Sequence, residues 1–432
     1  MRKLKHLFAF IGLTTAFLSE DTKAQEFFKD RKLYLNEDGS NYVKFTFMTQ
    51  AWLRYADYNP GTTINGVEKS RGTDIGIRRY RVQMYGQLTD RVFAYSQFGE
   101  NNFNAISDRK LGFFVHDAYG EYAIDKQKLS LGIGLSGWSG LSRFSSPSVG
   151  SILGIDAPLF LQTTNDVNDQ FLRKLSVFAK GKLGKLDYRL QMAQPMEINT
   201  TAPIGEVSDF SKNPPEMQWN GYFQYQFKDQ ESNLTPYMTG TYQGEKRVFN
   251  IGAGFIYQKD AMWRLNTAND TITANMVHFA GDVYYDAPVG SRGQSISLYG
   301  NVTYYDFGKD YIRNSGPMNP ANGSNNSAIL NEGGNSFPMY GTGTTVYAQA
   351  GYKFRNDLIG KTTLMPYVSL QHSDYEGLND PMDFFDAGIN WLLSGNTSKF
   401  TIAYQNRPIF DSSGNKTGTK GAVIAQYQVL FN

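Results

Sequence analysis

The stretch "VKFTFMTQAWLRY", Val43–Tyr55, alternates apolar and polar side chains along most of its length. Phe45 and Leu53 belong to the apolar set, and Lys44 and Arg54 belong to the polar set between them. Because successive side chains of a strand point to opposite sides, this pattern predicts a strand with one apolar and one polar face.

The same alternation recurs along the chain, with segments separated by tight turns and by long polar loops. The segments are 43–55, 74–88, 91–101, 113–124, 128–138, 171–183, 185–195, 217–227, 234–243, 248–257, 276–287, 294–307, 344–355, 362–372, 383–393, 399–406 and 422–431. Alternating segments of about ten residues are typical of transmembrane barrels. We therefore predict an all-β fold, a single transmembrane antiparallel up-and-down β-barrel.

The number of strands follows from the parity of the connections. Bacterial single-chain barrels have an even number of strands, whereas the pattern gives 17 segments. Counting tight periplasmic turns from each end of the chain, the two schemes collide between Asp229 and Asn275. Either Ala261–Asn266 is a further strand, which gives 18 strands, or two segments in this region are one, which gives 16.

The composition agrees with a wall between lipid and water. Aromatic residues make up 15% of the 432 residues, with 28 Tyr and 30 Phe beside 43 Gly, yet mean hydropathy is negative. Lipid on one face and water on the other explain both features. The net charge of +2 gives no basic field for nucleic acid, and the absence of cysteine excludes disulfides, thiol nucleophiles and a lipidated N-terminal cysteine.

The N-terminus reads as an export signal. Basic residues at Arg2, Lys3 and Lys5 precede the apolar run 7–18, and a polar stretch then leads to Ala24. We predict a signal peptide over 1–24, a short periplasmic segment over 25–42 and the barrel over 43–432. The mature chain is expected to cross the inner membrane and to lie in the cell outer membrane, in contact with its lipid and lipopolysaccharide.

The end of the chain carries a second signal of destination. Alternate residues from Val423 to Phe431 are apolar and end in an aromatic side chain. This resembles the signal that the outer-membrane barrel assembly machinery recognises, except that Asn432 follows the aromatic residue.

Three stretches carry a family resemblance. They are "DIGIRRYRVQMYGQLTDRVFAYSQFGE" (Asp74–Glu100), "LSLGIGLSGWSGLSRFSSPSVGSILGIDAP" (Leu129–Pro158) and "RKLSVFAKGKLGKLDYRLQMAQP" (Arg173–Pro195). They resemble the phosphate-selective porin O and P family of outer-membrane channels, and the style of the sequence resembles porins of Bacteroidota. The resemblance implies a homotrimeric pore whose inward basic residues guide anions.

The connection 139–170 is the third long loop by parity, and it is unusually apolar. Leu141, Phe144 and Ile155 would be poorly placed in a freely solvated loop. We expect it to fold into the lumen and to carry Arg143 and Asp156 toward the permeation path. The alternative is an ordered surface flap or a loop that contacts another subunit.

Inward basic residues are the candidates for binding anions. An Arg on the lipid face near the midplane costs about 2–4 kcal/mol, so the basic residues of the strands are predicted to face the lumen. The candidate pore-lining residues are Arg79, Arg81, Arg143, Lys174, Lys180, Lys182 and Arg189. Acidic residues predicted to face inward are Asp117, Glu121, Asp187, Asp282 and Asp386. The basic residues therefore form either an anion-selective ladder or structural salt bridges across the lumen.

The sequence contains no pattern typical of a catalytic or metal site. His116, His278 and His372 lack metal-ligand spacing, and His278 is predicted to face inward, away from a lipid substrate. The loops "DSSGNKTG" (411–418) and "NEGGNS" (331–336) match no defined calcium loop. We expect no enzyme, no metal and no cofactor. The function that we expect is that of an outer-membrane diffusion channel, a porin, for small hydrophilic solutes, with a preference for anions such as phosphate. The alternative is a plugged structural or partner-binding outer-membrane barrel of a secretion or uptake complex.

Overall fold

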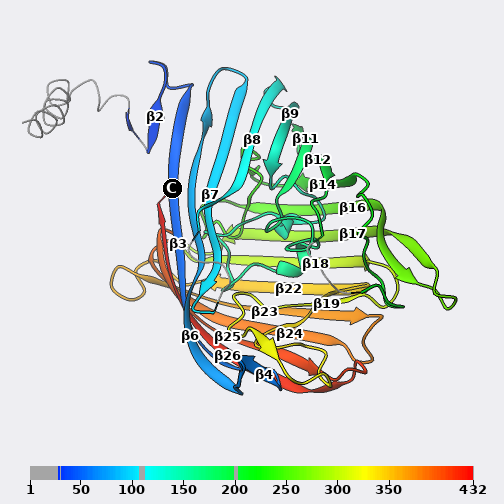
Figure 1. Ribbon diagram of the computed structural model, residues 1–432. Coiled ribbons are helices and arrows are strands. Elements are labelled where there is room, and N and C mark those ends of the chain that lie inside the picture. The colour runs from blue at the N-terminus through cyan, green and yellow to red at the C-terminus, as the bar shows by residue number, and fades with distance from the viewer. Residues whose placement is uncertain (1–27, 30, 107–111, 199–202, 432) are drawn as a thin grey trace, which may run out of the picture.

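The wall of the molecule is a closed antiparallel barrel (Figure 1). The computed structural model describes residues 28–29, 31–106, 112–198 and 203–431, so the predicted signal peptide lies outside the described residues. Within these ranges 16 strands form the wall, which confirms the predicted fold class. They are β3 (Tyr42–Asp57), β6 (Arg71–Gln87), β7 (Val92–Asn104), β8 (Phe114–Asp125), β9 (Leu129–Ser136), β11 (Lys174–Leu183), β12 (Leu186–Gln194), β14 (Gln218–Gln226), β16 (Val248–Leu265), β17 (Thr271–Pro288), β18 (Ser295–Asp306), β22 (Gly343–Lys353), β23 (Thr363–Tyr375), β24 (Met382–Ser394), β25 (Ser398–Phe410) and β26 (Lys416–Phe431).

The barrel closes where the last strand meets the first. β26 pairs with β3 without interruption, from Phe431 opposite Phe47 to Ala422 opposite Ala56. The alternating C-terminal stretch is therefore the strand that completes the wall, and neither of these two strands has a free edge along the paired residues.

Shorter elements lie at the two ends and inside. They are β1 (Phe28–Lys29), β2 (Lys32–Tyr34), β4 (Thr62–Ile64), β5 (Val67–Glu68), η1 (Arg143–Ser145), β10 (Pro147–Ser148), η2 (Leu159–Leu161), β13 (Asp209–Phe210), β15 (Met238–Thr239), β19 (Ile312–Ser315), β20 (Gly323–Ser324) and β21 (Phe337–Gly341). In the described part of the chain, no helix has the length and apolar character needed to cross a membrane.

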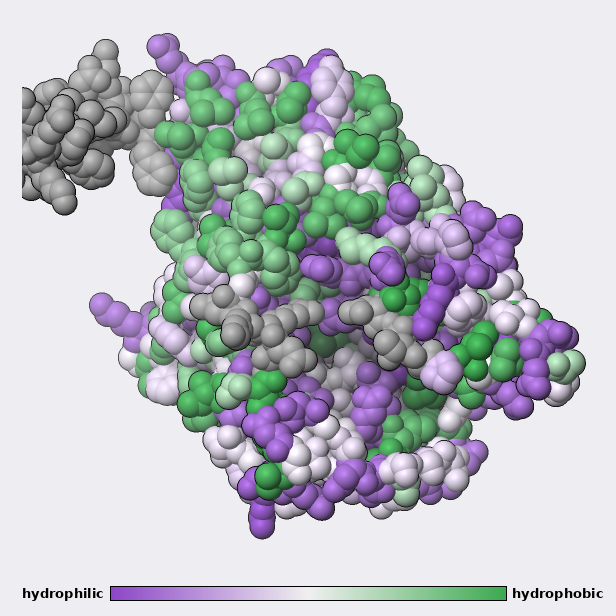
Figure 2. Space-filling model, in the orientation of Figure 1, coloured by the Kyte–Doolittle hydropathy of each residue, from purple (hydrophilic) through white to green (hydrophobic). Residues whose placement is uncertain are grey.

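The two faces of the wall follow the alternation of the sequence. On β3, Phe45 and Leu53 are 41% and 50% exposed on the outside, whereas Gln50 and Arg54 are buried inside. Similar apolar side chains stand outward on the other wall strands, and Figure 2 shows them gathered over the part of the wall where Figure 1 shows β7 and β8. A lipid-facing exterior explains this exposure, which would be costly in water.

The strand count is 16, for a reason different from the one that the sequence suggested. Leu234–Gln243 is not a wall strand, because the connection from β14 to β16 turns into the lumen there and forms only the two-residue β15. Ala261–Leu265 continues β16 beyond a break in the register between Gln258 and Met262. A segment held between two protein surfaces also buries alternate residues, so its period of two resembled that of a wall strand.

Candidate functional site

The loop 137–173, which connects β9 to β11, lies inside the barrel. It is hydrogen-bonded to wall strands on several sides, through Asn220 of β14, Asp282 of β17, Tyr367 of β23 and Lys399 of β25. These bonds are 2.7–2.9 Å long and end on the backbone of the loop. The loop is therefore anchored to the inner wall at four strands.

The long connection 307–342 covers the lumen from the long-loop end. Its strand β21 pairs with β19, and Phe337, Met339 and Tyr340 are buried. The hydroxyl of Tyr340 donates a 3.1 Å hydrogen bond to the carbonyl oxygen of Leu159, which joins this connection to loop 137–173.

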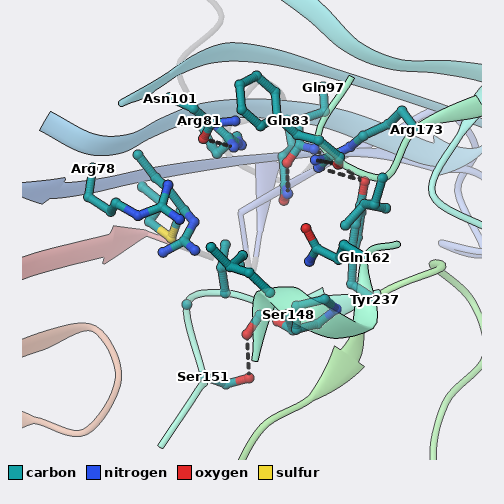
Figure 3. Close-up of a pocket in the computed structure, with 18 of the residues that line it drawn as sticks. Arg78, Arg81, Gln83, Gln97, Asn101, Ser148, Ser151, Gln162, Arg173 and Tyr237 are labelled. Atoms are coloured by element: carbon teal, nitrogen blue, oxygen red, sulfur yellow. Dashed lines mark hydrogen bonds between the residues drawn. The ribbon is translucent and has the colours of Figure 1, made fainter. Parts of the chain in front are cut away.

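A cavity of about 280 Å³ remains between loop 137–173 and the wall formed by β3, β6 and β7 (Figure 3). Its lining includes Lys44 and Tyr85 near the short-turn end of the strands, and Asn102 and Pro317 at the long-loop end. A hollow of about 640 Å³ among the long loops shares Asp166 with this lining. The cavity therefore extends along β6 from Arg78 to Tyr85 and continues toward the long loops.

The wall of this cavity is rich in guanidinium groups because β6 contains a bulge. Gln50 of β3 pairs with Arg79, but the next residue, Ala51, pairs with Ile77, so Arg78 has no partner across the strand. The extra residue turns both Arg78 and Arg79 inward, and both side chains are buried. Alternation alone would have pointed Arg78 toward lipid.

The two adjacent arginines share one carboxylate of the loop. Asp156 forms ion pairs with Arg78 at 2.8 Å and with Arg79. Burial raises the pKa of Asp156, but the two guanidinium groups more than offset that effect, and the pKa lies below its usual value. The carboxylate is therefore ionised at neutral pH and compensates part of the positive charge.

Arg81 has a different set of partners. It donates to the backbone oxygens of Tyr80 at 2.8 Å and Glu100 at 2.7 Å, and to the side-chain oxygen of Asn101. Among the described residues, no carboxylate lies within ion-pair distance of its guanidinium group. Its positive charge is therefore not compensated by a direct partner.

Arg173 faces Arg81 across the cavity from the end of loop 137–173 (Figure 3). It lies 3.3 Å from a carboxylate oxygen of Asp117 and donates a 3.0 Å hydrogen bond to the hydroxyl of Tyr237. With Lys44 at the short-turn end, five basic side chains line one continuous cavity: Lys44, Arg78, Arg79, Arg81 and Arg173.

The predicted pore-lining residues separate into two groups. Arg79 and Arg81 line the cavity, whereas Arg143, Lys174, Lys180, Lys182 and Arg189 do not. Lys180 and Lys182 instead line a hollow of about 540 Å³ at the short-turn end.

Four residues of the second group have a carboxylate within ion-pair distance. Lys174 pairs with Asp169 at 2.7 Å and Lys180 pairs with Glu121 at 2.9 Å. The guanidinium of Arg189 lies 3.7 Å from Asp187. Arg143 pairs with Glu231, which lies on the connection between β14 and β16. These contacts place the second group in the packing of the lumen.

Three basic residues of the cavity were missed as candidates. Lys44 lies on the inward face that the alternation predicts, so it was available from the sequence. Arg78 depends on the bulge in β6, and Arg173 lies in the loop immediately before β11, where strand alternation does not apply. No group of three or more side chains suited to a metal ion occurs among the described residues.

Comparison with solved structures finds a similar fold in two bacterial proteins. The structure of Salmonella typhi OmpF in complex with daunomycin is similar with a TM-score of 0.52 and 13% identity, over 92% of this chain and 99% of that one. The high-pH structure of Pseudomonas putida OprB is similar with a TM-score of 0.53 and 8% identity, over 90% and 94%. At such identities the likeness shows the fold alone.

The sequence comparisons add no family. No protein-family model matches the chain, and no curated protein is similar enough to count as a relative. The resemblance to the phosphate-selective porin O and P family therefore stays a prediction.

Proposed function

We propose that this barrel is an outer-membrane diffusion channel, a porin, for small hydrophilic solutes, with a preference for anions such as phosphate. The observation that carries the proposal is the cavity along β3, β6 and β7, which extends toward both ends of the wall and is lined by five basic side chains. A plain structural barrel would have no need for so many basic side chains along one cavity.

The charges of the cavity favour anions. The lining contains four guanidinium groups, one ammonium group and the carboxylate of Asp166. Asp156 pairs with Arg78 and Arg79, so the two carboxylates leave positive charge in excess. A passage lined by one sign of charge lowers the barrier for ions of the other sign. Guanidinium groups also match the oxygen atoms of phosphate in geometry, which supports a preference for oxyanions.

The proposal includes the surroundings of the channel. The outward apolar side chains suit outer-membrane lipid, and the long loops suit contact with lipopolysaccharide at the outer surface. We also propose a homotrimer, which native mass spectrometry of the detergent-solubilised protein tests by its mass.

Single-channel current in a planar bilayer tests the proposal. The refolded mature protein is placed in a KCl gradient, and phosphate is then added. We expect discrete current steps, a reversal potential of the sign for anions, and partial block by phosphate. The double variant Arg79→Gln and Arg81→Gln should lose most of this preference, while the exposed Arg292→Gln should keep it.

A plugged, partner-binding barrel is the second candidate, and a specific observation favours it. The lumen is filled by loop 137–173, by the connection 307–342 and by a segment from the short-turn end. A correctly folded barrel that gives no current steps would support this function and exclude the channel. Steps without ion preference would leave a general diffusion channel and exclude the role of the basic wall.

A further inference from the structure

The connection between β14 and β16, residues 227–247, enters the lumen from the short-turn end, and we call it the inner segment. Other connections at that end are brief, such as 88–91, 126–128 and 395–397. The inference below rests on the proposed channel function and concerns what sets the width of the channel.

Most of the inner segment is not needed to join its two strands. The backbone N–H of Asp229 donates a 3.0 Å hydrogen bond to the carbonyl oxygen of Arg247, and the N–H of Arg247 donates a 2.8 Å bond to the Asp229 carboxylate. The hairpin is therefore already closed at these two residues. Residues 230–246 extend beyond the closed hairpin into the lumen.

An ion pair joins the inner segment to loop 137–173. Both terminal nitrogens of Arg143 donate to the carboxylate of Glu231 at 2.6 Å, and one of them also donates to the carbonyl oxygen of Thr239 at 2.6 Å. The hydroxyl of Tyr242 donates to the same carboxylate at 2.7 Å. The Arg143 guanidinium also lies over the ring of Tyr284, 3.6 Å from its centre. This bidentate, buried pair is a strong and directional contact.

The backbones of the two segments also meet directly. Strand β15 of the inner segment pairs in parallel with β10 of the loop, with Ser148 opposite Thr239. The Met238 N–H donates a 2.8 Å bond to the carbonyl oxygen of Ser146. A Cβ on Gly240 would lie 2.5 Å from the Cα of Ile152, so glycine permits this close approach. The loop is thus supported from the side of the short turns.

Basic residues of the wall strands β11 and β12 donate hydrogen bonds to the backbone of the inner segment. Lys180 donates to the carbonyl oxygens of Asn233 at 2.7 Å and Leu234 at 3.1 Å, and Arg189 donates to that of Pro236 at 2.7 Å. Lys182 donates to the carbonyl oxygen of Glu231. These cations therefore satisfy the backbone of a buried connection, which explains why they do not line the cavity.

The inner segment also supplies part of the cavity wall. Thr235 and Tyr237 line the cavity, and the Tyr237 hydroxyl donates a 2.6 Å hydrogen bond to Asp117 and accepts one from Arg173. Figure 3 shows Tyr237 beside Arg173, opposite the wall that carries Arg81.

We propose that the inner segment, together with loop 137–173, narrows the lumen. It closes the side of the lumen enclosed by β11, β12 and β16, holds loop 137–173 in place through Glu231, and confines permeation to the cavity along β3, β6 and β7. Tyr237 is then a residue that determines specificity, because it positions Arg173 in the cavity wall.

Shortening the connection tests this role. Residues 230–246 are replaced by Asn-Gly, the pair that favours a two-residue hairpin turn, so that Asp229 and Arg247 remain the last hydrogen-bonded pair. We expect single-channel conductance to rise severalfold and the anion preference to fall. The control replaces the exposed connection 356–361 in the same way and should conduct as the native protein does. Native conductance and ion preference in a folded 230–246 variant would overturn the proposal.

A pair of cysteines tests the position of the inner segment beside loop 137–173 without shortening the segment. The chain contains no cysteine, so Ser148→Cys with Thr239→Cys introduces a single possible disulfide between residues that are partners in the parallel bridge. We expect the disulfide to form in the folded protein, and the double variant to have the same conductance in its oxidised and reduced forms. A folded protein in which it does not form under oxidising conditions would overturn the proposal.

A third comparison separates the effect of the ion pair between Arg143 and Glu231 from the effect of the volume that the inner segment fills. Glu231→Gln removes the carboxylate that holds Arg143, whereas Glu245→Gln changes an exposed residue of the same segment. We expect a noisier open state only for Glu231→Gln. Identical single-channel current traces for the two variants would overturn the role of the ion pair between Arg143 and Glu231.

Failure of this inference is distinguishable from failure of the proposed function. A native protein with current steps and a shortened variant with the same steps would overturn the inference and keep the channel. A native protein without steps and a shortened variant with large steps would support the inner segment as a closure and overturn the open native channel.

Discussion

Arg81 and Arg79 lie two residues apart on β6 and line the same cavity, yet they differ in charge compensation. Asp156 pairs with Arg79, whereas Arg81 bonds to backbone oxygens and to the Asn101 amide. An uncompensated charge acts on a passing ion over a longer distance than one half of an ion pair. Single replacements of Arg79 and Arg81 therefore compare a paired with an unpaired arginine in the same cavity.

We predict that Arg81→Gln lowers the anion-to-cation permeability ratio more than Arg79→Gln does. Loss of the Arg81 charge should change the difference between the barriers by about 1 kcal/mol, roughly a fivefold change in the ratio. Reversal potentials in a KCl gradient measure it. An equal effect of the two single variants would show that compensation by Asp156 does not matter.

Asp156→Asn is predicted to act in the opposite direction. The substitution leaves Arg78 and Arg79 without their carboxylate, so the cavity gains positive charge and the anion preference should rise. Removal of one partner from a buried pair costs about 3–5 kcal/mol, so unfolding should also occur at lower denaturant concentration. Reversal potential and denaturant titration together check this, and an unchanged reversal potential would place Asp156 outside the path.

The limits of the sequence at this scale are illustrated by two neighbouring residues. Arg79 and Arg81 could be predicted because alternation assigns them to the polar face of a strand. Arg78 could not, because its direction depends on a bulge that only the pairing of β6 with β3 defines. The partners of Lys180 could not be predicted either, since they belong to a connection more than fifty residues away in the chain.

At the scale of elements, two loop carboxylates hold loop 137–173 in place, and their ionisation gives a pH dependence. Burial raises the pKa of Asp156 and of Glu231, but Arg78 and Arg79 in the first case and Arg143 in the second bring both below their ordinary values of 3.8 and 4.5. A lowered folded pKa contributes stability above the ordinary value that is lost as pH falls through the folded value.

We therefore predict that these two ion pairs hold the loop from neutral pH down to the ordinary carboxylate range. As pH falls through the folded pKa values, which lie below 3.8 for Asp156 and below 4.5 for Glu231, the carboxylates become protonated, the ion pairs break, and the loop loosens. Single-channel recording across a pH series should show added noise as pH falls below this range. The absence of such a change in the folded protein would contradict the role of the two ion pairs.

Glycine positions on the inner wall let loop 137–173 lie directly on the strands. A Cβ on the inward Gly254 of β16 would lie 2.4 Å from the carbonyl oxygen of Leu141, whereas one on the outward Gly281 of β17 would have its nearest neighbour at 4.0 Å. We predict that Gly254→Ala destabilises the protein by about 1–3 kcal/mol through overpacking, and that Gly281→Ala changes stability little. Denaturant unfolding of both refolded variants measures the difference, and equal stability would mean that the loop can move away freely.

The elements that the sequence predicted best are the wall strands, whose outer face is apolar. A strand between lipid and lumen has a period of two along its whole length, which is a local property. The inner segment shows the opposite case, since Leu234–Gln243 has the same period but lies between loop 137–173 and β11. Its surroundings come from distant parts of the chain, and no local pattern distinguishes them from a sheet.

For the whole molecule, the closed barrel followed from the sequence, and the way in which its lumen is filled did not. The barrel requires only that each strand pair with its neighbour and that β26 meet β3. The filling requires three connections to pack against one another, as in the contacts of Arg143 with Glu231 and of Tyr340 with Leu159. The width of the passage is therefore a property of the assembled lumen and of no single strand.

The orientation of the wall toward lipid gives a prediction for the whole molecule. Ile389 lies in the middle of β24 and is 50% exposed on the outside, next to the inward and buried Asn390. If the barrel spans a bilayer, Ile389→Arg should cost about 2–4 kcal/mol relative to Ile389→Ala, because the guanidinium group would face hydrocarbon. Guanidinium chloride unfolding in lipid vesicles measures the difference. In a water-exposed wall the two variants would unfold at the same denaturant concentration, because an arginine would be solvated as well as an alanine. Equal stability would therefore exclude hydrocarbon at this face, and with it a barrel that spans the membrane at this height.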